Sequence, residues 1–120
     1  MVADERTEIE AAVRELAARA RLVLTTGGTG VAPRDVTPEA THAVIEREVP
    51  GIAEALRAGS AAKTPYGLLS RGTAGIVGET LVVNLPGSPG GCRDGFAVVR
   101  PVLEHALGLL AGESTAHRQT

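Results

Sequence analysis

"LVLTTGGTGVAPRDVTPEAT" runs from Leu22 to Thr41 and contains the clearest local pattern in the chain. Leu22 to Thr26 is short and apolar, which predicts a strand buried on both faces of a sheet. Glycines follow directly, and glycine permits the positive φ angles that tight turns need. Thr37 is then placed to cap a helix, with Pro38 at the first helical position. The stretch therefore predicts a strand, a turn of bare backbone and a helix in immediate succession.

The rest of the chain predicts further helices and one more buried strand. Four helical regions are indicated: Asp4–Ala20 with Asp4 as N-cap, Thr37 to near Val49 because Pro50 follows, Ile52–Ala58 closed by Gly59, and Phe96 to Leu110 with a kink or restart at Pro101. Gly72–Gly78 is glycine-rich, Thr80–Leu85 predicts the second strand, and Pro86–Gly91 predicts a tight loop. Because strands alternate with helices, we expect an α/β fold, a three-layer α/β/α sandwich around a mostly parallel central sheet.

Composition limits the classes of function. The 120 residues suit one domain, which we place at residues 1–112 with a disordered tail at 113–120. Phe96 and Tyr66 are the only aromatic residues, so the core must consist of Val, Ile, Leu and Ala. A net charge of −2 without a basic stripe argues against a nucleic-acid partner. The single cysteine, Cys92, excludes an intrachain disulfide. No long apolar run is present, so we expect a soluble cytoplasmic protein without membrane contact.

Two glycine-rich loops each follow a strand of the expected sheet. In open α/β sheets, ligands bind at the carboxyl ends of the strands, so "TTGGTG" and "NLPGSPGG" are expected at one crevice. Exposed amides ahead of a helix favour an anion such as phosphate. "GGTG" matches neither the P-loop nor the dinucleotide fingerprint. The pattern alone therefore leaves an ordinary strand-to-helix turn equally open.

Asp35 lies five residues after Gly30 and just ahead of the expected helix. A carboxylate repels a phosphate unless a cation lies between them. Mg²⁺ held by one or two carboxylates and by substrate phosphates would reconcile the two charges. The alternative is that Asp35 pairs with Arg34 or caps the helix.

Four segments together resemble a known family. "LVLTTGGTGVAPRDVTPEAT", "PGIAEALRAGS", "TPYGLLSRGTAG" and "TLVVNLPGSPGG" resemble the molybdopterin-binding family over about residues 2–111. The family includes the Mog-type molybdopterin adenylyltransferases and the matching domain of gephyrin. The resemblance implies an enzyme of molybdenum cofactor biosynthesis that joins AMP from Mg-ATP to the terminal phosphate of molybdopterin. It also implies a homotrimer, sometimes a hexamer, that passes its product to a protein inserting molybdate.

The resemblance also assigns roles to single residues. Asp35 matches the family's essential acid and is expected to bind Mg²⁺, and Asp4 matches a second catalytic, metal-binding acid. The residues expected to bind substrate are Gly27, Gly28, Thr29 and Gly30 in the first loop, Pro86, Gly87, Ser88 and Pro89 in the second, and Ser70 and Arg71. The "SR" pair is assigned either to a substrate phosphate or to trimer packing. Structural alternatives stay open: Asp4 and Ser88 as helix caps, and Arg71 as a partner of a surface acid.

Family members usually carry a strand, a "D.SG" loop, a helix and another strand before the acid that Asp4 matches. We therefore expect an N-terminally truncated version of the fold, with an unpaired sheet edge and with part of the nucleotide pocket missing. Three functions remain: an active adenylyltransferase, a pterin-binding or scaffold relative without turnover, and an inactive truncated remnant.

Overall fold

The computed structural model describes residues 2–112, with side chains from residue 5 onward. The expected tail at 113–120 and the side chain of Asp4 lie outside the described residues. In chain order the elements are α1 (Val2–Ala17), β1 (Leu22–Thr26), α2 (Thr37–Val44), β2 (Arg47–Glu48), α3 (Pro50–Lys63), the 3₁₀-helix η1 (Pro65–Leu69), β3 (Ala74–Val77), β4 (Thr80–Leu85) and α4 (Pro89–Leu110).

The strands form one mixed sheet in the order β1-β4-β3-β2. β1 pairs with β4 in parallel, whereas β3 is antiparallel to both β4 and β2. The expectation of a mostly parallel sheet is therefore wrong. Only Gly78 and Glu79 join β3 to β4, and so short a connection permits only a hairpin. Gly78 has a φ of 60°, a conformation suited to glycine.

Two of the strands were not expected from the sequence. β3 lies inside the glycine-rich run, where Gly75 has no room for a side chain. A Cβ there would lie 2.4 Å from Ile45 Cδ1 and 2.7 Å from the Arg47 carbonyl oxygen. The neighbouring β2 pairs with β3, and it occupies residues that were expected to belong to α2, which ends at Val44 and not near Val49. Close backbone approach thus explains both the glycine and the missed strands.

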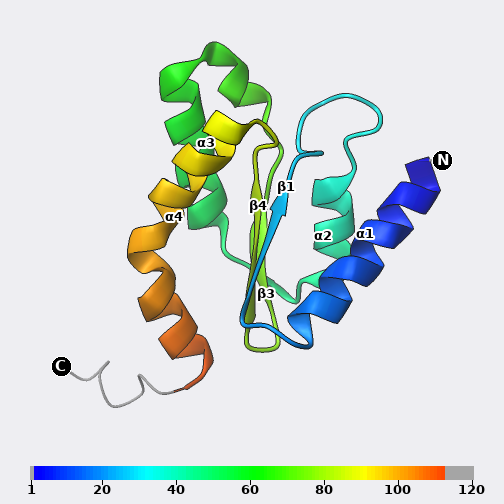
Figure 1. The fold of residues 1–120 in the computed structure, drawn as a ribbon, viewed down its shortest axis with the longest axis vertical. Helices are drawn as coiled ribbons and strands as arrows, with labels where there is room; N and C mark the ends of the chain where they lie inside the picture. The colour runs from blue at the N-terminus through cyan, green and yellow to red at the C-terminus, as the bar shows by residue number, and fades with distance from the viewer. Residues whose placement is uncertain (1, 113–120) are drawn as a thin grey trace.

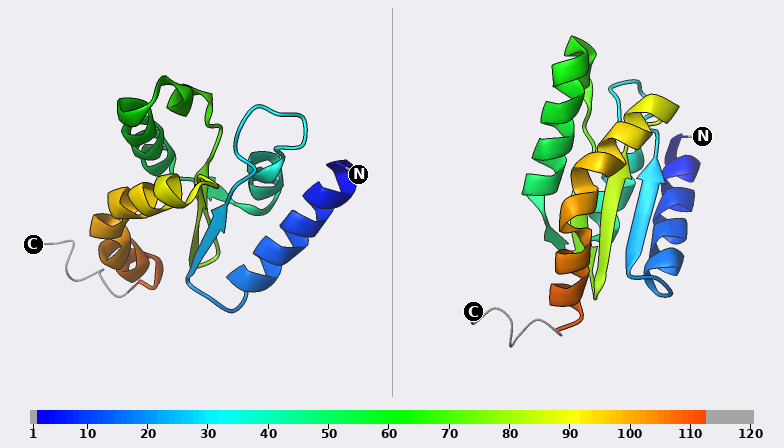
Figure 2. Two further views of the ribbon diagram at one scale, coloured as in Figure 1. Left: turned by 45° about the horizontal axis from the view of Figure 1, so that its top comes forward. Right: turned by 60° about the vertical axis from the view of Figure 1, so that its left-hand side comes forward.

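Two helices cover each face of the sheet, which gives the three layers that the sequence predicts (Figures 1 and 2). Alternate residues of β4 face opposite layers. Leu81, Val83 and Leu85 pack in a cluster with residues of α3 and α4, whereas Val82 packs with Val13 of α1 and other residues of the opposite face. The buried hydrophobic residues are Val, Leu and Ala, as the shortage of aromatic residues required.

The boundaries of all four α-helices in the described residues differ from expectation. α1 begins at Val2 and ends at Ala17, so Asp4 is not its N-cap. Val36, not Thr37, is the N-cap residue of α2, and no side chain caps that helix. α3 continues through Gly59 to Lys63, and a Cβ at Gly59 would make only an ordinary van der Waals contact with Val98 of α4. α4 begins at Pro89, inside the expected loop and ahead of the expected start at Phe96, and it runs through Pro101 without a break.

β1 is an edge strand of the described sheet and is not buried on both faces. Val23 is 4% exposed, but Leu24 is 36% exposed. The unpaired edge that we expected is therefore present in the described residues. In the part of the chain described here, no helix has both the length and the apolar character to cross a membrane.

Candidate functional site

Gly27 and Gly28 turn the chain at the end of β1. Their φ angles are 87° and 70°, in the left-handed region that favours glycine. A Cβ on Gly28 would lie 2.3 Å from Thr37 Oγ1. The Thr37 amide donates a hydrogen bond of 3.1 Å to the Gly28 carbonyl. The first loop therefore folds back onto the start of α2, and a side chain at Gly28 would prevent this.

The two glycine-rich loops lie against each other. β1 and β4 are parallel, so their carboxyl ends, and the loops that follow them, share one edge of the sheet. The Gly27 amide donates to the Leu85 carbonyl over 3.0 Å. A Cβ built on Gly87 would lie 3.0 Å from Gly27 Cα, so the backbones approach closely. The structure thus brings together the loops that the sequence assigned to one crevice.

Ser88 caps α4 in the second loop. Its Oγ accepts a hydrogen bond of 3.1 Å from the Gly91 amide. The structural alternative considered for Ser88 is therefore present. Pro89 begins the helix, and Pro86 lines a neighbouring pocket of about 310 Å³ between α3 and α4.

Asp35 is half-buried and turns back over its own loop. Its Oδ2 accepts a hydrogen bond of 3.0 Å from the Ala32 amide. A Cβ on Gly30 would lie 2.9 Å from the same oxygen. Asp35 neither caps α2 nor pairs with Arg34 in the described structure, so neither structural alternative holds. Within the described residues its other carboxylate oxygen accepts no hydrogen bond.

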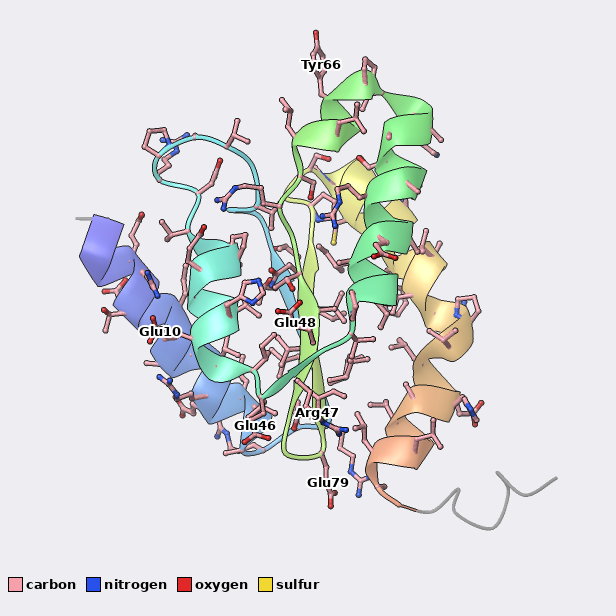
Figure 3. All side chains as sticks on the ribbon, turned by 180° about the vertical axis from the view of Figure 1, so that it is seen from behind. Glu10, Glu46, Arg47, Glu48, Tyr66 and Glu79 are labelled. Atoms are coloured by element: carbon pink, nitrogen blue, oxygen red, sulfur yellow. The ribbon has the colours of Figure 1, made fainter. Side chains whose placement is uncertain are left out.

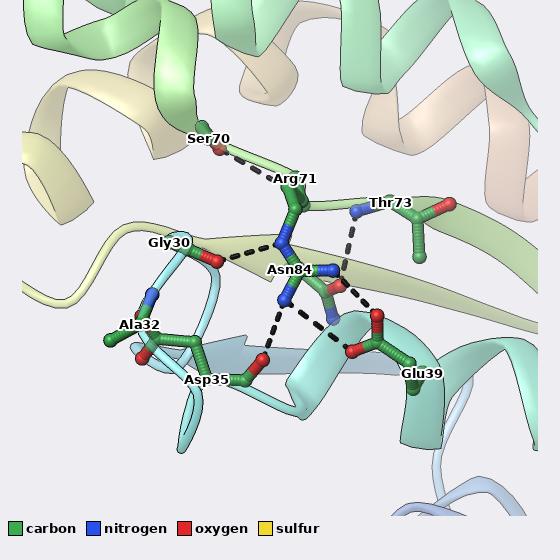
Figure 4. A network of polar contacts seen from close by, with 9 residues as sticks. Gly30, Ala32, Asp35, Glu39, Ser70, Arg71, Thr73 and Asn84 are labelled. Carbon is green, nitrogen blue, oxygen red and sulfur yellow. Dashed lines mark hydrogen bonds and ion pairs between the residues drawn. The ribbon is translucent and has the colours of Figure 1, made fainter.

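Arg71 holds the first loop against α2 (Figure 4). Its Nε donates to the Gly30 carbonyl over 2.7 Å, and its Nη2 donates to the Asp35 carbonyl. Nη1 forms an ion pair with Glu39, which lies in the first turn of α2. The hydrogen bond from Arg71 lowers the pKa of the Glu39 carboxyl below its ordinary value. The alternative in which Arg71 pairs with an acid is therefore observed, together with loop contacts that the sequence did not suggest.

The "SR" segment is itself held by Arg57 of α3. Its Nη1 donates to the carbonyls of Ser70 and Gly72 over 3.2 and 3.3 Å. The Ser70 hydroxyl accepts from the Gly72 amide. Arg71 is thus brought to the first loop, whereas the Ser70 side chain bonds only within its own segment.

Asn84 is a polar residue of the site region that was not predicted from the sequence. It is 3% exposed and lies in β4. Its amide nitrogen donates to the hydroxyls of Thr25 and Thr41 over 2.8 and 3.0 Å, and its oxygen accepts from the Thr73 amide. The signal was a lone asparagine in "TLVVNL", because a buried amide needs partners.

The donor set for a metal is small. Among the residues whose side chains are described, no group of three or more His, Cys, Asp or Glu could hold a metal ion. Asp35 supplies a carboxylate beside the glycine loop, Glu39 is engaged by Arg71, and the side chain of Asp4 lies outside the described residues. These residues fit a Mg²⁺ ion that takes one or two ligands from the protein and the rest from substrate phosphates and water.

The chain matches a known domain. Residues 1–105 match the family model described as the probable molybdopterin binding domain. The chain belongs to the molybdopterin-binding family. Within this family it is 42% identical over its whole length to the molybdenum cofactor synthesis protein cinnamon of Drosophila melanogaster. It is 41% identical over 93% of its length to a molybdopterin adenylyltransferase of Helicobacter pylori.

Solved members of the molybdopterin-binding family share the fold. The molybdopterin biosynthesis enzyme MoaB of Thermus thermophilus superposes with a TM-score of 0.83 at 53% identity, over 91% of this chain and 70% of that one. The chain spans 20% of the Drosophila protein and 65% of the Helicobacter protein. It is therefore equivalent to only part of each of these relatives.

Proposed function

We propose that this chain takes part in the adenylylation of molybdopterin, in which AMP from Mg-ATP is joined to the terminal phosphate of the pterin. The observation that carries the proposal is the contact between the two glycine-rich loops at the carboxyl ends of β1 and β4, with the Asp35 carboxylate directed over Gly30. The identity to a molybdopterin adenylyltransferase supports it.

In this reaction a phosphate oxygen of molybdopterin attacks the α-phosphorus of ATP. The new P–O bond forms as the bond to the β-phosphate breaks, and pyrophosphate leaves. The protein contributes chiefly position and charge. Main-chain amides from Gly28 to Gly30 bind the pterin phosphate in this proposal, and the second loop, Pro86 to Pro89, binds on the pterin side. Asp35 holds Mg²⁺, with Asp4 as the expected second ligand, and the bound ion supplies neutralisation of the phosphate charges.

The decisive assay mixes the chain with molybdopterin and ATP labelled at the α-phosphate, with Mg²⁺, and measures labelled pterin. Asp35→Asn keeps an oxygen for the Ala32 amide but removes the charge. We expect it to lower turnover by about a hundredfold or more, on the scale of other lost electrostatic contacts in active sites, and to leave pterin binding nearly intact. Asp94→Asn, at an exposed acid of α4 paired with Lys63, is the matched control. Wild-type turnover by Asp35→Asn contradicts the assignment.

A second candidate is pterin binding without turnover. The small donor set favours it, because the side chains described here offer no cluster of three metal ligands. Binding of molybdopterin by the wild-type chain without labelled product would select this function over the first.

The proposal includes the assembly that the resemblance implies, a homotrimer or hexamer that passes adenylylated molybdopterin to a protein inserting molybdate. Large exposed apolar side chains on η1 and α4 support an interface. Tyr66 is 77% exposed and points away from the molecule at the tip of η1 (Figure 3), and Leu68 of η1 and Val102 of α4 are also exposed. Sedimentation velocity of the chain tests the oligomeric state.

A further inference from the structure

We propose that Arg71 is a positioning residue that aims the Gly30 and Val31 amides at the phosphate of the ligand, and that Val31 therefore belongs to the binding loop. This inference rests on the proposed function and adds to it, because it says which main-chain groups bind the phosphate and what holds them in place.

Arg71 faces the protein with nearly all of its donors. A guanidinium has five N–H groups. In Arg71 it donates four hydrogen bonds within the chain, to the Gly30 carbonyl, the Asp35 carbonyl and both carboxylate oxygens of Glu39. Little capacity is left for a substrate phosphate. The contacts therefore favour a role that acts through the loop rather than by direct binding.

The carbonyls that Arg71 binds determine where the neighbouring amides point. Its main-chain amide donates to the Thr29 carbonyl over 2.7 Å, and its Nε donates to the Gly30 carbonyl over the same distance. In a trans peptide the C=O and N–H groups point in opposite directions, and the described chain contains no cis peptide. The Gly30 and Val31 amides therefore point away from Arg71.

These two amides have no partner in the described part of the chain. By contrast, the next amide, that of Ala32, donates to the Asp35 carboxylate. The Val31 side chain is 62% exposed, so this part of the loop is open to solvent and to a ligand. Two adjacent amides that the half-exposed Arg71 and Glu39 side chains hold facing away from Arg71 are a suitable site for a phosphate oxygen.

Glu39 fixes the position of the Arg71 guanidinium. It lies on α2, whose first residue, Thr37, is tied to the Gly28 carbonyl. Arg71 thus spans from α2 to the middle of the loop, across a part of the chain that glycines leave without side-chain support. A lysine has one ammonium group and cannot reach the same set of acceptors in a fixed plane.

The test begins with ¹H–¹⁵N spectra of the wild-type chain titrated with molybdopterin and, separately, with the pterin lacking its terminal phosphate. We expect the Gly30 and Val31 amide resonances to shift with molybdopterin and to stay in place with the dephosphorylated ligand. Wild-type binding of molybdopterin that leaves both resonances unchanged overturns the inference, and no variant is needed for that result.

The second arm compares Arg71→Lys with Arg100→Lys, a matched change at an exposed residue of α4. We expect Arg71→Lys to weaken binding of molybdopterin by about ten- to a hundredfold, the range for hydrogen bonds to a charged group, and to leave binding of the dephosphorylated pterin unchanged. A merely structural role would weaken both ligands alike. Equal affinities for molybdopterin in the two variants overturn the inference.

The same measurements separate this inference from the proposed function. Shifted Gly30 and Val31 amides without any labelled product overturn the adenylylation and support the inference. A wild-type chain that binds no molybdopterin overturns both.

Discussion

At the residue scale, Gly28 is the position of the first loop that tolerates a side chain least. It combines a left-handed backbone with a Cβ position 2.3 Å from Thr37 Oγ1. We expect Gly28→Ala to lower the free energy of unfolding by about 1–3 kcal/mol, the usual cost of such backbone strain, with the steric clash in addition. Urea denaturation measures the loss.

Gly51 provides the matched control for this substitution. It lies in α3, has an ordinary negative φ, and a Cβ there would meet nothing within 4 Å. Gly51→Ala should therefore raise stability, by up to about 1 kcal/mol, because alanine is the better helix former. Equal effects at the two positions would contradict the argument from loop geometry.

Glu39 gives the site a pH-dependent contribution to stability. The hydrogen bond from Arg71 lowers its pKa below the ordinary 4.5, and the charges of Arg71 and Arg6 act in the same direction. A lowered folded-state pKa means that the contribution is complete above pH 4.5 and is lost as pH falls through the folded pKa. We expect the wild-type chain to be more stable than Glu39→Gln at pH 7 and to lose that advantage below pH 4.5 in thermal denaturation. A constant difference across this range would exclude the ion pair as the cause.

At the element scale, Asn84 joins β4 to its surroundings. It bonds to Thr25 of β1, Thr41 of α2 and the amide of Thr73 ahead of β3. Asn84→Ala leaves the buried Thr73 amide without its partner, and we expect a loss of about 2–3 kcal/mol in the free energy of unfolding. Guanidinium denaturation measures it. Thr25→Ala, which removes only one of these contacts, should cost clearly less.

Element placement was predictable where a local pattern carried it. The two loops were predicted to share one edge of the sheet, because each contains glycines that follow an apolar run, β1 or β4. The structure has both loops at that edge. β3 was not predicted because the glycine at position 75 is required by its close contacts with Ile45 and Arg47, which are distant in the sequence. The partners of Arg71 could not be predicted for the same reason. Glu39 and Gly30 lie 32 and 41 residues away from it, and no local periodicity encodes such contacts.

At the scale of the whole molecule, β1 leaves one edge of the described sheet open. The Arg21 carbonyl accepts from the Leu81 amide, and the Gly27 amide donates to the Leu85 carbonyl. Between these two bonds, every second residue of β1 directs its backbone N–H and C=O groups toward β4. Leu24 is one of the intervening residues, so its backbone groups point away from β4. An open edge with an exposed apolar side chain favours pairing with other strands.

Concentration-dependent association of the chain should follow from this edge. We expect Leu24→Lys to reduce the associated fraction in sedimentation velocity, because an edge lysine opposes strand pairing. Val102→Lys, on the exposed face of α4, separates this route from association through the helices. Unchanged association in Leu24→Lys would show that the edge is not the contact.

The close approach of Gly27 and Gly87 has a consequence for anyone wishing to redesign this protein. A Cβ on Gly87 would lie 3.0 Å from Gly27 Cα, so a side chain there would push the first loop away, and Gly27 is itself restricted to glycine by its φ of 87°. Residues 31–34, by contrast, are exposed on the outer part of the first loop. Libraries that diversify these four positions and keep both glycines fixed would explore new ligand preferences while the scaffold beneath them stays intact.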